Sequence, residues 1–278
     1  MAALQFRVQC VDRLAVSSSK YPKRIFEHYG FAPVGRCIYC GTQEVALSKE
    51  HIIARAIGGN VTVAKASCAK CSAITRDVEQ FCFRNMLGAF RIRMGFPTSR
   101  PKERPSKLPL SIIHTDKRVE IGSVEIPDHP AMLVMPTFST VPHVLLGMHG
   151  TGTCGAWSFI VNPDAIKSHP EGTRVGGMPF HAEIFCRMLA KIAHAYAVAD
   201  AGVNAFQPIL PDFILGKTKM PVDYYIGCVP GAVPEEDTLH RVHLDQAEGN
   251  GLKYLTANIR LFAKFGAPQY HVAVGPLS

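Results

Sequence analysis

The longest helix-like pattern in the first half of the chain lies between Ala69 and Met94. Its apolar residues recur every three or four positions, at Ile74, Val78, Phe81, Cys82 and Met86. This spacing puts them on one face of a helix. Gly95 provides a C-terminal stop, and Pro97 follows it. The pattern predicts one helix over residues 69–94.

After residue 109 the pattern changes to short runs in which apolar and polar residues alternate, which is typical of β-strands. The runs are LPLSIIHT, KRVEIGSVEI, AMLVM, WSFIV, VDYYIGCV and PQYHVAVG. One strong helix pattern interrupts them from Phe180 to Ala201, bounded by Pro179 and Gly202. The second half is therefore expected to be α+β.

Prolines at every fourth position from Pro97 to Pro109 separate the two patterns. Proline fixes φ and lacks a backbone N–H, so this segment is predicted to be extended. We interpret 97–109 as a Pro-rich basic linker between a domain at 31–96 and an α+β domain at 110–278, with residues 1–30 as an N-terminal extension. Alternatively, the segment is a strap over the first domain whose basic side chains face phosphates.

Composition places the chain among soluble globular proteins, since 47% of its 278 residues are hydrophobic. No run approaches the roughly 18 apolar residues that a membrane span needs. Charged residues also interrupt what would be the apolar region of an N-terminal secretory signal. We therefore expect a cytoplasmic protein with no membrane partner.

Charge is unevenly distributed along the chain. Residues 1–107 carry 18 Lys and Arg against 7 Asp and Glu, whereas residues 108–278 carry 12 against 15. A concentrated basic excess predicts a polyanion such as nucleic acid as the partner of the first part. The mildly acidic second part leaves a homodimer or another protein partner open.

Two C-x-x-C pairs stand out among nine cysteines: Cys37 with Cys40, and Cys68 with Cys71. An odd count containing two such pairs favours a metal in a reducing compartment over a disulfide framework. Four thiolates suit a tetrahedral structural Zn²⁺. The other cysteines are expected to be unpaired thiols, mostly small buried hydrophobes: Cys10, Cys82, Cys154, Cys186 and Cys228.

The segment between the cysteine pairs contains further signals. A strand candidate ends at the run Glu50-His51-Ile52-Ile53, a loop follows at Gly58-Gly59-Asn60, and a second strand candidate precedes Cys68. The predicted helix begins inside the second cysteine pair. A zinc knuckle, a hairpin and this helix together predict a treble-clef arrangement.

The order of these parts, from about Gly35 to Met94, resembles the HNH endonuclease family in its four-cysteine zinc form, with a ββα-metal fold. The resemblance implies hydrolysis of DNA phosphodiester bonds. It implies that Glu50 holds Mg²⁺ or Mn²⁺, that His51 is the general base, and that Ser72 helps to seat the metal. Arg76, one helical turn after Ser72, is predicted to clamp a phosphate oxygen. Restriction, phage defence or mobile elements are roles that the resemblance permits.

Two departures from the family keep other functions open. Ser72 stands where the family usually has asparagine, and Ala54 where proline often follows the Glu-His-Ile run. A hydroxyl reaches less far than an amide oxygen, so the alternative is a zinc-stabilised nucleic-acid-binding module with lost or weak catalysis. A third hypothesis makes the second domain a ligand sensor that the first tethers to nucleic acid.

Other candidate residues have simpler interpretations. His194 is expected at a core edge or interface, Trp157 in the core, and the run GTGTCG at 150–155 in a turn, because it lacks the end of a phosphate loop. Six basic residues form either a solvated face or a DNA-contacting one, a choice that the sequence leaves open: Lys65, Lys70, Arg76, Arg84, Arg91 and Arg93.

Overall fold

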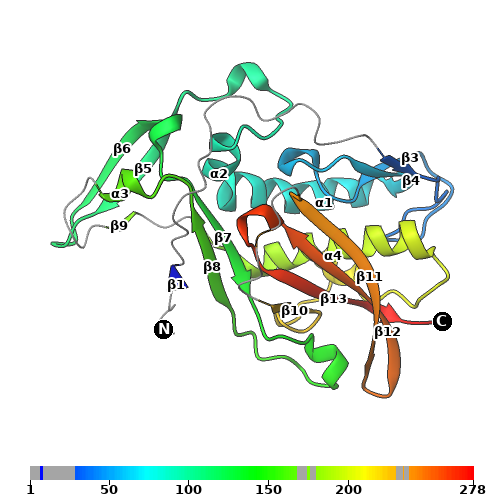
Figure 1. The fold of residues 1–278 in the computed structure, drawn as a ribbon. Helices are drawn as coiled ribbons and strands as arrows, with labels where there is room; N and C mark the ends of the chain where they lie inside the picture. Colours follow the sequence, from blue (N-terminus) through cyan, green and yellow to red (C-terminus); the bar gives the residue numbers. More distant parts are fainter. Residues whose placement is uncertain (1–6, 9–28, 168–173, 176–179, 230–233, 235–237) are drawn as a thin grey trace.

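The structure is a computed structural model that describes residues 7–8, 29–167, 174–175, 180–229, 234 and 238–278. Helices and strands are mixed along the chain, so the fold is α+β, as predicted (Figure 1). Cys10 and Pro179 lie outside the described residues. Within the described part, no helix combines the length and the apolar character that crossing a membrane requires.

The first part of the chain forms a three-stranded sheet and the helix that follows it. The strands are β2 (Tyr29–Phe31), β3 (Leu47–His51) and β4 (Val61–Cys68), in the order β2-β4-β3. β4 runs antiparallel to β3 and parallel to β2. The first helix, α1 (Ala69–Phe81), begins directly after β4. The strand, loop, strand and helix therefore follow one another as the sequence predicted.

The helix predicted over 69–94 is present in three pieces. After α1 come a π-helical segment, η2 (Cys82–Met86), and a short helix, α2 (Gly88–Arg93). Gly95 follows with a left-handed φ of 69°, which ends the helical run as expected. Arg91 of α2 is half-buried, and its guanidinium donates hydrogen bonds to the carbonyl oxygens of Ala56 at 2.6 Å and Phe83 at 3.1 Å. Arg91 is therefore occupied by structural contacts within the protein.

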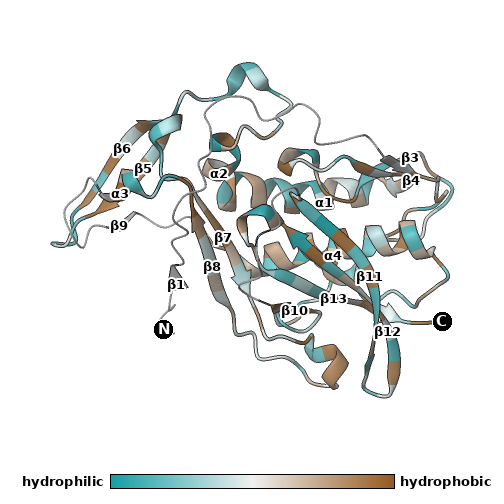
Figure 2. Ribbon diagram, viewed as in Figure 1, coloured by the Kyte–Doolittle hydropathy of each residue, from teal (hydrophilic) through white to brown (hydrophobic). Residues whose placement is uncertain are grey.

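The second part contains three further sheets. A four-stranded antiparallel sheet has the order β10-β13-β12-β11, with bounds Ile226–Val229, Gln269–Pro276, Leu252–Leu261 and His240–Gly249. A second sheet joins β1 (Arg7–Val8), β8 (Gly155–Ile160) and β7 (Met132–Thr137), and Figure 2 shows apolar residues along β7 and β8. A third joins β6 (Val119–Glu125), β5 (Lys107–Ile113) and β9 (Arg174–Val175). The remaining short helices are η1 (Arg55–Ile57), η3 (Pro101–Glu103), η4 (Ile126–Asp128), η5 (His143–Leu146), α3 (Asp164–Lys167), α5 (Pro211–Ile214) and η6 (Ala263–Phe265).

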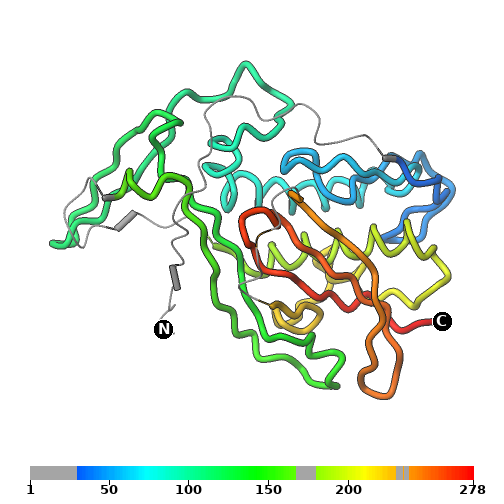
Figure 3. Tube along the Cα trace, viewed as in Figure 1, coloured from blue at the N-terminus to red at the C-terminus, as the bar shows by residue number. Residues whose placement is uncertain are grey.

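Helix α4 (Ala182–Ala201) is the centre of the molecule. It packs against α1 on one side and against β12 and β13 on the other (Figures 1 and 3). Its residues are buried on nearly all sides between Phe185 and Val198, as expected for a helix enclosed in a core. Lys191 and His194 are three residues apart and both contact the first part of the chain, so they lie on the α1-facing side.

One hydrophobic core spans both parts of the chain and includes the buried Trp157. The ring of Phe90 packs edge-on against Phe262 and Phe265, with centroid distances of 5.5 Å and 5.3 Å. The Pro-rich segment therefore does not separate two independent cores. The domain limits near residues 97–109 stay a prediction.

Each predicted run contains a strand, but the run VDYYIGCV is a strand only from Ile226 to Val229, because its first half forms a turn. The longest hairpin was not predicted. β12 is buried along almost its whole length, so it shows no alternation of apolar and polar residues. Its turn did carry a signal, because Asn250 (φ 46°) and Gly251 (φ 74°) form a two-residue connection between Gly249 and Leu252. An Asn-Gly turn with two positive φ angles is the preferred short hairpin connection.

Candidate metal centre and active site

The four predicted zinc ligands lie together. The Sγ atoms of Cys37, Cys40, Cys68 and Cys71 are all within 4.8 Å of one another, and Cys40 and Cys68 are 3.8 Å apart. Sulfurs at 2.3 Å from a tetrahedral Zn²⁺ are separated by about 3.8 Å. Three of the cysteines are buried and Cys40 is exposed. The cluster is placed to hold a metal ion and is consistent with structural zinc.

The backbone around the first cysteine pair forms a tight turn. The Cys37 N–H donates to Thr42 and the Gly41 N–H donates back to Cys37, each at 2.8 Å. Gly41 has a left-handed φ of 78°, a conformation that favours glycine. The β3–β4 ladder is irregular between Ser48 and Glu50. In this stretch β4 accepts hydrogen bonds from the segment around the first cysteine pair, including one from the Ile38 N–H to the Ala66 carbonyl oxygen at 2.9 Å. These bonds hold the first cysteine pair near the end of β4.

The thiols have different proton affinities. Burial raises the pKa of Cys68, but hydrogen bonds with Cys71, Cys37 and Cys40 outweigh burial and lower that pKa to about 7. Burial raises the pKa of Cys37 and of Cys71. A cluster in which one thiol ionises near neutrality suits a thiolate-binding cation.

The Glu50-His51 dipeptide ends strand β3, where the sequence placed it. Glu50 pairs with Val63 and His51 with Thr62 across the β3–β4 ladder. The chain then turns through η1, which is closed by Gly58 with a left-handed φ of 93°. A Cβ atom at Gly59 would overlap the carbonyl oxygen of Ile53. Both glycines are thus required by the turn that follows the dipeptide.

A buried lysine from α4 contacts the dipeptide. Lys191 is 1% exposed, and its Nζ lies 2.8 Å from Glu50 Oε1 and 2.8 Å from Glu79 Oε1. The same ammonium donates to the carbonyl oxygens of His51 and, at 3.4 Å, of Ile52. Burial alone would lower the pKa of Lys191, but the two carboxylates raise it, so the group is a cation.

His51 is half-buried beside this lysine. Burial lowers its pKa, and the positive charges of Lys191 and Lys49 lower it further. The imidazole is therefore neutral at neutral pH, the form that can accept a proton. Lys49 and Arg55 are exposed, and the positive charge of Arg55 also lowers the pKa of His51.

The two other predicted site residues lie on α1. Ser72 is half-buried in its first turn, and its carbonyl oxygen accepts a hydrogen bond from the Thr75 hydroxyl at 3.3 Å. The Arg76 side chain is 63% exposed and lies 4.0 Å from Asp77, a loose ion pair. A metal-seating role for Ser72 and a phosphate-clamping role for Arg76 stay predictions.

Sequence reasoning missed Glu79 and Lys191, although both carried a signal. Lys191 stands in the apolar run MLAKIAHA, and a lysine in a fully buried helix needs a charged partner. Glu79 comes seven residues after Ser72, which puts the two residues on one face of α1. Glu50, Glu79 and Lys191 are far apart in the sequence, so only the structure shows that they form ion pairs.

Two histidines also attach the second part of the chain to the first. His194 Nε2 lies 2.7 Å from the carbonyl oxygen of Ile38, and His240 Nε2 lies 2.6 Å from that of Ile57. Burial lowers the pKa of each to about 4, so both rings are neutral at neutral pH. His194 was predicted at a core edge or interface; it is fully buried at the contact between the two parts of the chain.

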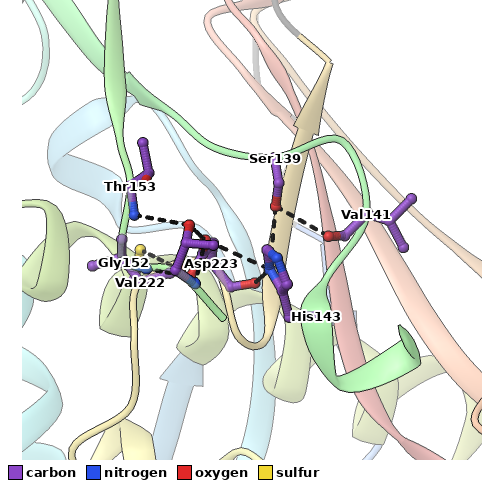
Figure 4. Close-up of polar contacts among 9 residues, drawn as sticks. Ser139, Val141, His143, Gly152, Thr153, Val222 and Asp223 are labelled. Carbon is purple, nitrogen blue, oxygen red and sulfur yellow. Dashed lines mark hydrogen bonds and ion pairs between the residues drawn. The ribbon is translucent and has the colours of Figure 1, made fainter. Parts of the chain in front are cut away.

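A second polar cluster surrounds the run at residues 150–155 (Figure 4). The N–H groups of Thr151 and Gly152 donate to the fully buried carboxylate of Asp223 at 3.0–3.1 Å. Ser139 and His143 complete the cluster, which therefore contains the three residue types of a catalytic triad. The same ring nitrogen, His143 Nδ1, lies 3.4 Å from Ser139 Oγ and 3.5 Å from Asp223 Oδ2. A catalytic triad uses the two ring nitrogens separately. The cluster therefore lacks the geometry of a triad. The run is an irregular loop before β8 whose N–H groups bind an internal carboxylate, where the sequence predicted a turn.

Comparison with known proteins identifies the segment that contains the cysteines and the dipeptide. Residues 37–86 match the family model described as HNH endonuclease. The resemblance predicted from the sequence is confirmed for this segment, and the match indicates a nuclease that acts on nucleic acid. No curated protein and no solved structure matches the chain.

Proposed function

We propose that the protein is an endonuclease that hydrolyses phosphodiester bonds of DNA, with His51 as the general base. The match of residues 37–86 to the HNH endonuclease family carries this proposal. The neutral imidazole at the end of β3, with the exposed Lys49 and Arg55 near it, supports it. The cations would attract the phosphate backbone, and the base would act on the water beside it.

In the proposed reaction, His51 accepts a proton from water as the water oxygen attacks phosphorus. A new P–O bond forms, the bond to the leaving sugar oxygen breaks, and that oxygen takes a proton from solvent. Exposed cations stabilise the growing negative charge on the phosphate. Arg76 is our candidate for the cation that contacts a phosphate oxygen directly.

The predicted Mg²⁺ or Mn²⁺ ion would supply a Lewis acid for the leaving oxygen. The residues assigned to it fit this role poorly, because Glu50 is buried and its carboxylate already pairs with the Lys191 ammonium at 2.8 Å. Ser72 offers only a hydroxyl. No step of the proposed reaction therefore requires Glu50 to hold a divalent ion.

The test is incubation of zinc-loaded protein with supercoiled plasmid in Mg²⁺, Mn²⁺ or EDTA. We expect nicked or linear product from the wild type and a loss of about 100-fold or more in His51→Ala. His149→Ala, which removes an exposed histidine, is the matched control. Equal cleavage by His51→Ala and the wild type would contradict the proposal.

A second candidate function is a nucleic-acid-binding module with weak or lost catalysis. The pairing of Glu50 with Lys191 and the serine at position 72 favour it. A mobility shift without cleavage in any metal would support this function. Cleavage gained in Ser72→Asn would instead identify a weakened enzyme.

A further inference from the structure

The carboxylate that the family pattern assigns to a metal is bound to a cation from the chain itself. Lys191 Nζ is equidistant, at 2.8 Å, from Glu50 and Glu79, so it fills the position between two carboxylates. A divalent ion on Glu50 would sit about 2.1 Å from the same carboxylate group. Two cations that close, shielded from water, repel each other strongly.

Lys191 has little freedom to leave this position. Its ammonium is held by the two carboxylates and by the carbonyl oxygens of His51 and Ile52. Its side chain is 2% exposed and projects from the central helix α4, which is buried on nearly all sides. Displacement into solvent would leave the buried Glu50 and the partly buried Glu79 without a counterion.

We propose that Lys191 is a positioning residue for His51, and that its ammonium, in place of a divalent ion, is the cation that Glu50 holds. The proposal rests on the proposed function, in which His51 is the base. The Lys191 ammonium binds the Glu50 carboxylate and the carbonyl oxygens of His51 and Ile52. These contacts fix the backbone that carries the imidazole. Lys191 lies in α4, outside the residues that match the family. A positioning role for Lys191 would therefore make α4 a part of the active site.

The first experiment compares the kinetics of Lys191→Met and His194→Gln in the zinc-loaded full chain. His194 lies on the same face of α4 and also contacts a carbonyl oxygen of the first part, but it does not contact residues 50–52. We expect kcat to fall about 10- to 100-fold in Lys191→Met with KM changed less than about threefold. We expect His194→Gln to lower the unfolding temperature while kcat stays within about threefold of the wild type.

The second experiment measures Mn²⁺ binding by electron paramagnetic resonance, which needs no activity. We expect Glu50→Gln to bind Mn²⁺ as the wild type does, and Lys191→Met to bind it at least about tenfold more tightly, because two carboxylates lose their counterion. A loss of more than about tenfold in Glu50→Gln would show that Glu50 holds the divalent ion and would overturn the proposal.

A third measurement separates failure of the proposal from failure of the proposed function. The ring ¹⁵N resonances of His51, assigned by difference from His51→Gln, should move in Lys191→Met and stay unchanged in His194→Gln. If the wild type cleaves no substrate, the nuclease function fails, but these resonances and the Mn²⁺ titrations still decide where Lys191 acts. Unchanged His51 resonances in Lys191→Met would overturn the positioning role.

Discussion

The cysteine cluster and the Glu50-His51 site lie in the same short segment but are built differently. All four cysteines come from residues 37–71, and local turns bring their sulfurs within 4.8 Å of one another. The Glu50-His51 site is completed from outside the segment by Lys191 of α4. A locally built site is visible in sequence spacing, whereas a site completed by a distant helix is not.

Removal of the metal from the cysteine cluster, the locally built site, should produce the largest effect on stability. Structural zinc contributes on the order of 10 kcal/mol to the folding of small zinc domains. Because one core spans both parts of the chain, we expect chelation or Cys71→Ser to unfold the whole protein rather than the segment alone. Thermal denaturation with zinc analysis measures this effect. Cys154→Ser, outside the cluster, is the control, and a separate melting of the second part would contradict the prediction.

Loss of Lys191, which completes the Glu50-His51 site from the distant helix α4, should produce the next largest effect on stability. Lys191→Met leaves the buried Glu50 and the partly buried Glu79 without a counterion, which costs about 3–5 kcal/mol of unfolding free energy. Urea denaturation measures this cost. The control is Lys217→Met, which removes an exposed pair with Asp212 and should leave the midpoint unchanged. The double variant Lys191→Met with Glu50→Gln should recover part of the loss, because only one unpaired carboxylate remains.

Acid should weaken the docking of the second part through His194 and His240. Each has a pKa near 4 in the folded state, below its ordinary value of 6.5. Between pH 6.5 and 4 the unfolded state therefore binds more protons than the folded state. The stability that the two neutral rings contribute is fully present above pH 6.5 and is lost as the pH falls toward 4. We expect each histidine to cost about 2 kcal/mol at pH 5.

Unfolding free energies at pH 7 and pH 5 test this dependence. His194→Gln and His240→Gln should each reduce the difference between the two pH values, and the exposed His149→Gln serves as control. A difference that is equally large in the wild type, in His194→Gln and in His240→Gln would show that other groups cause the acid sensitivity.

Gly59→Ala tests the local turn that carries the dipeptide. A Cβ atom would overlap the Ile53 carbonyl oxygen, so the backbone must move, at a cost of about 1–3 kcal/mol. Gly122→Ala is a matched control, because a Cβ atom there meets no neighbour within 4 Å. Equal unfolding free energies for the two variants would contradict a tight turn after His51.

The sequence predicted those features that depend on short spacing. The cysteine pairs, strands β3 and β4, the loop at Gly58-Gly59-Asn60 and the start of α1 follow from local patterns, and the structure has them. It did not predict that a lysine from α4 reaches Glu50, because residues 50 and 191 share no local pattern. Nor did it predict strand β12, since a strand that is buried along almost its whole length loses the alternation by which strands are recognised.

Arg76→Ala should produce the smallest effect on stability, because the guanidinium is 63% exposed and its ion pair with Asp77 is 4.0 Å long. If Arg76 contacts a phosphate, its loss should weaken DNA binding uniformly across sequences and reduce the slope of log affinity against log salt by about one. Arg84→Ala removes another exposed cation of the same helical run and allows the two positions to be compared directly. A slope that changes in Arg84→Ala but not in Arg76→Ala would move the phosphate contact away from the first turns of α1. An equal change in both would mean that the DNA follows the whole basic face, so that the segment binds through its summed charge rather than through one arginine.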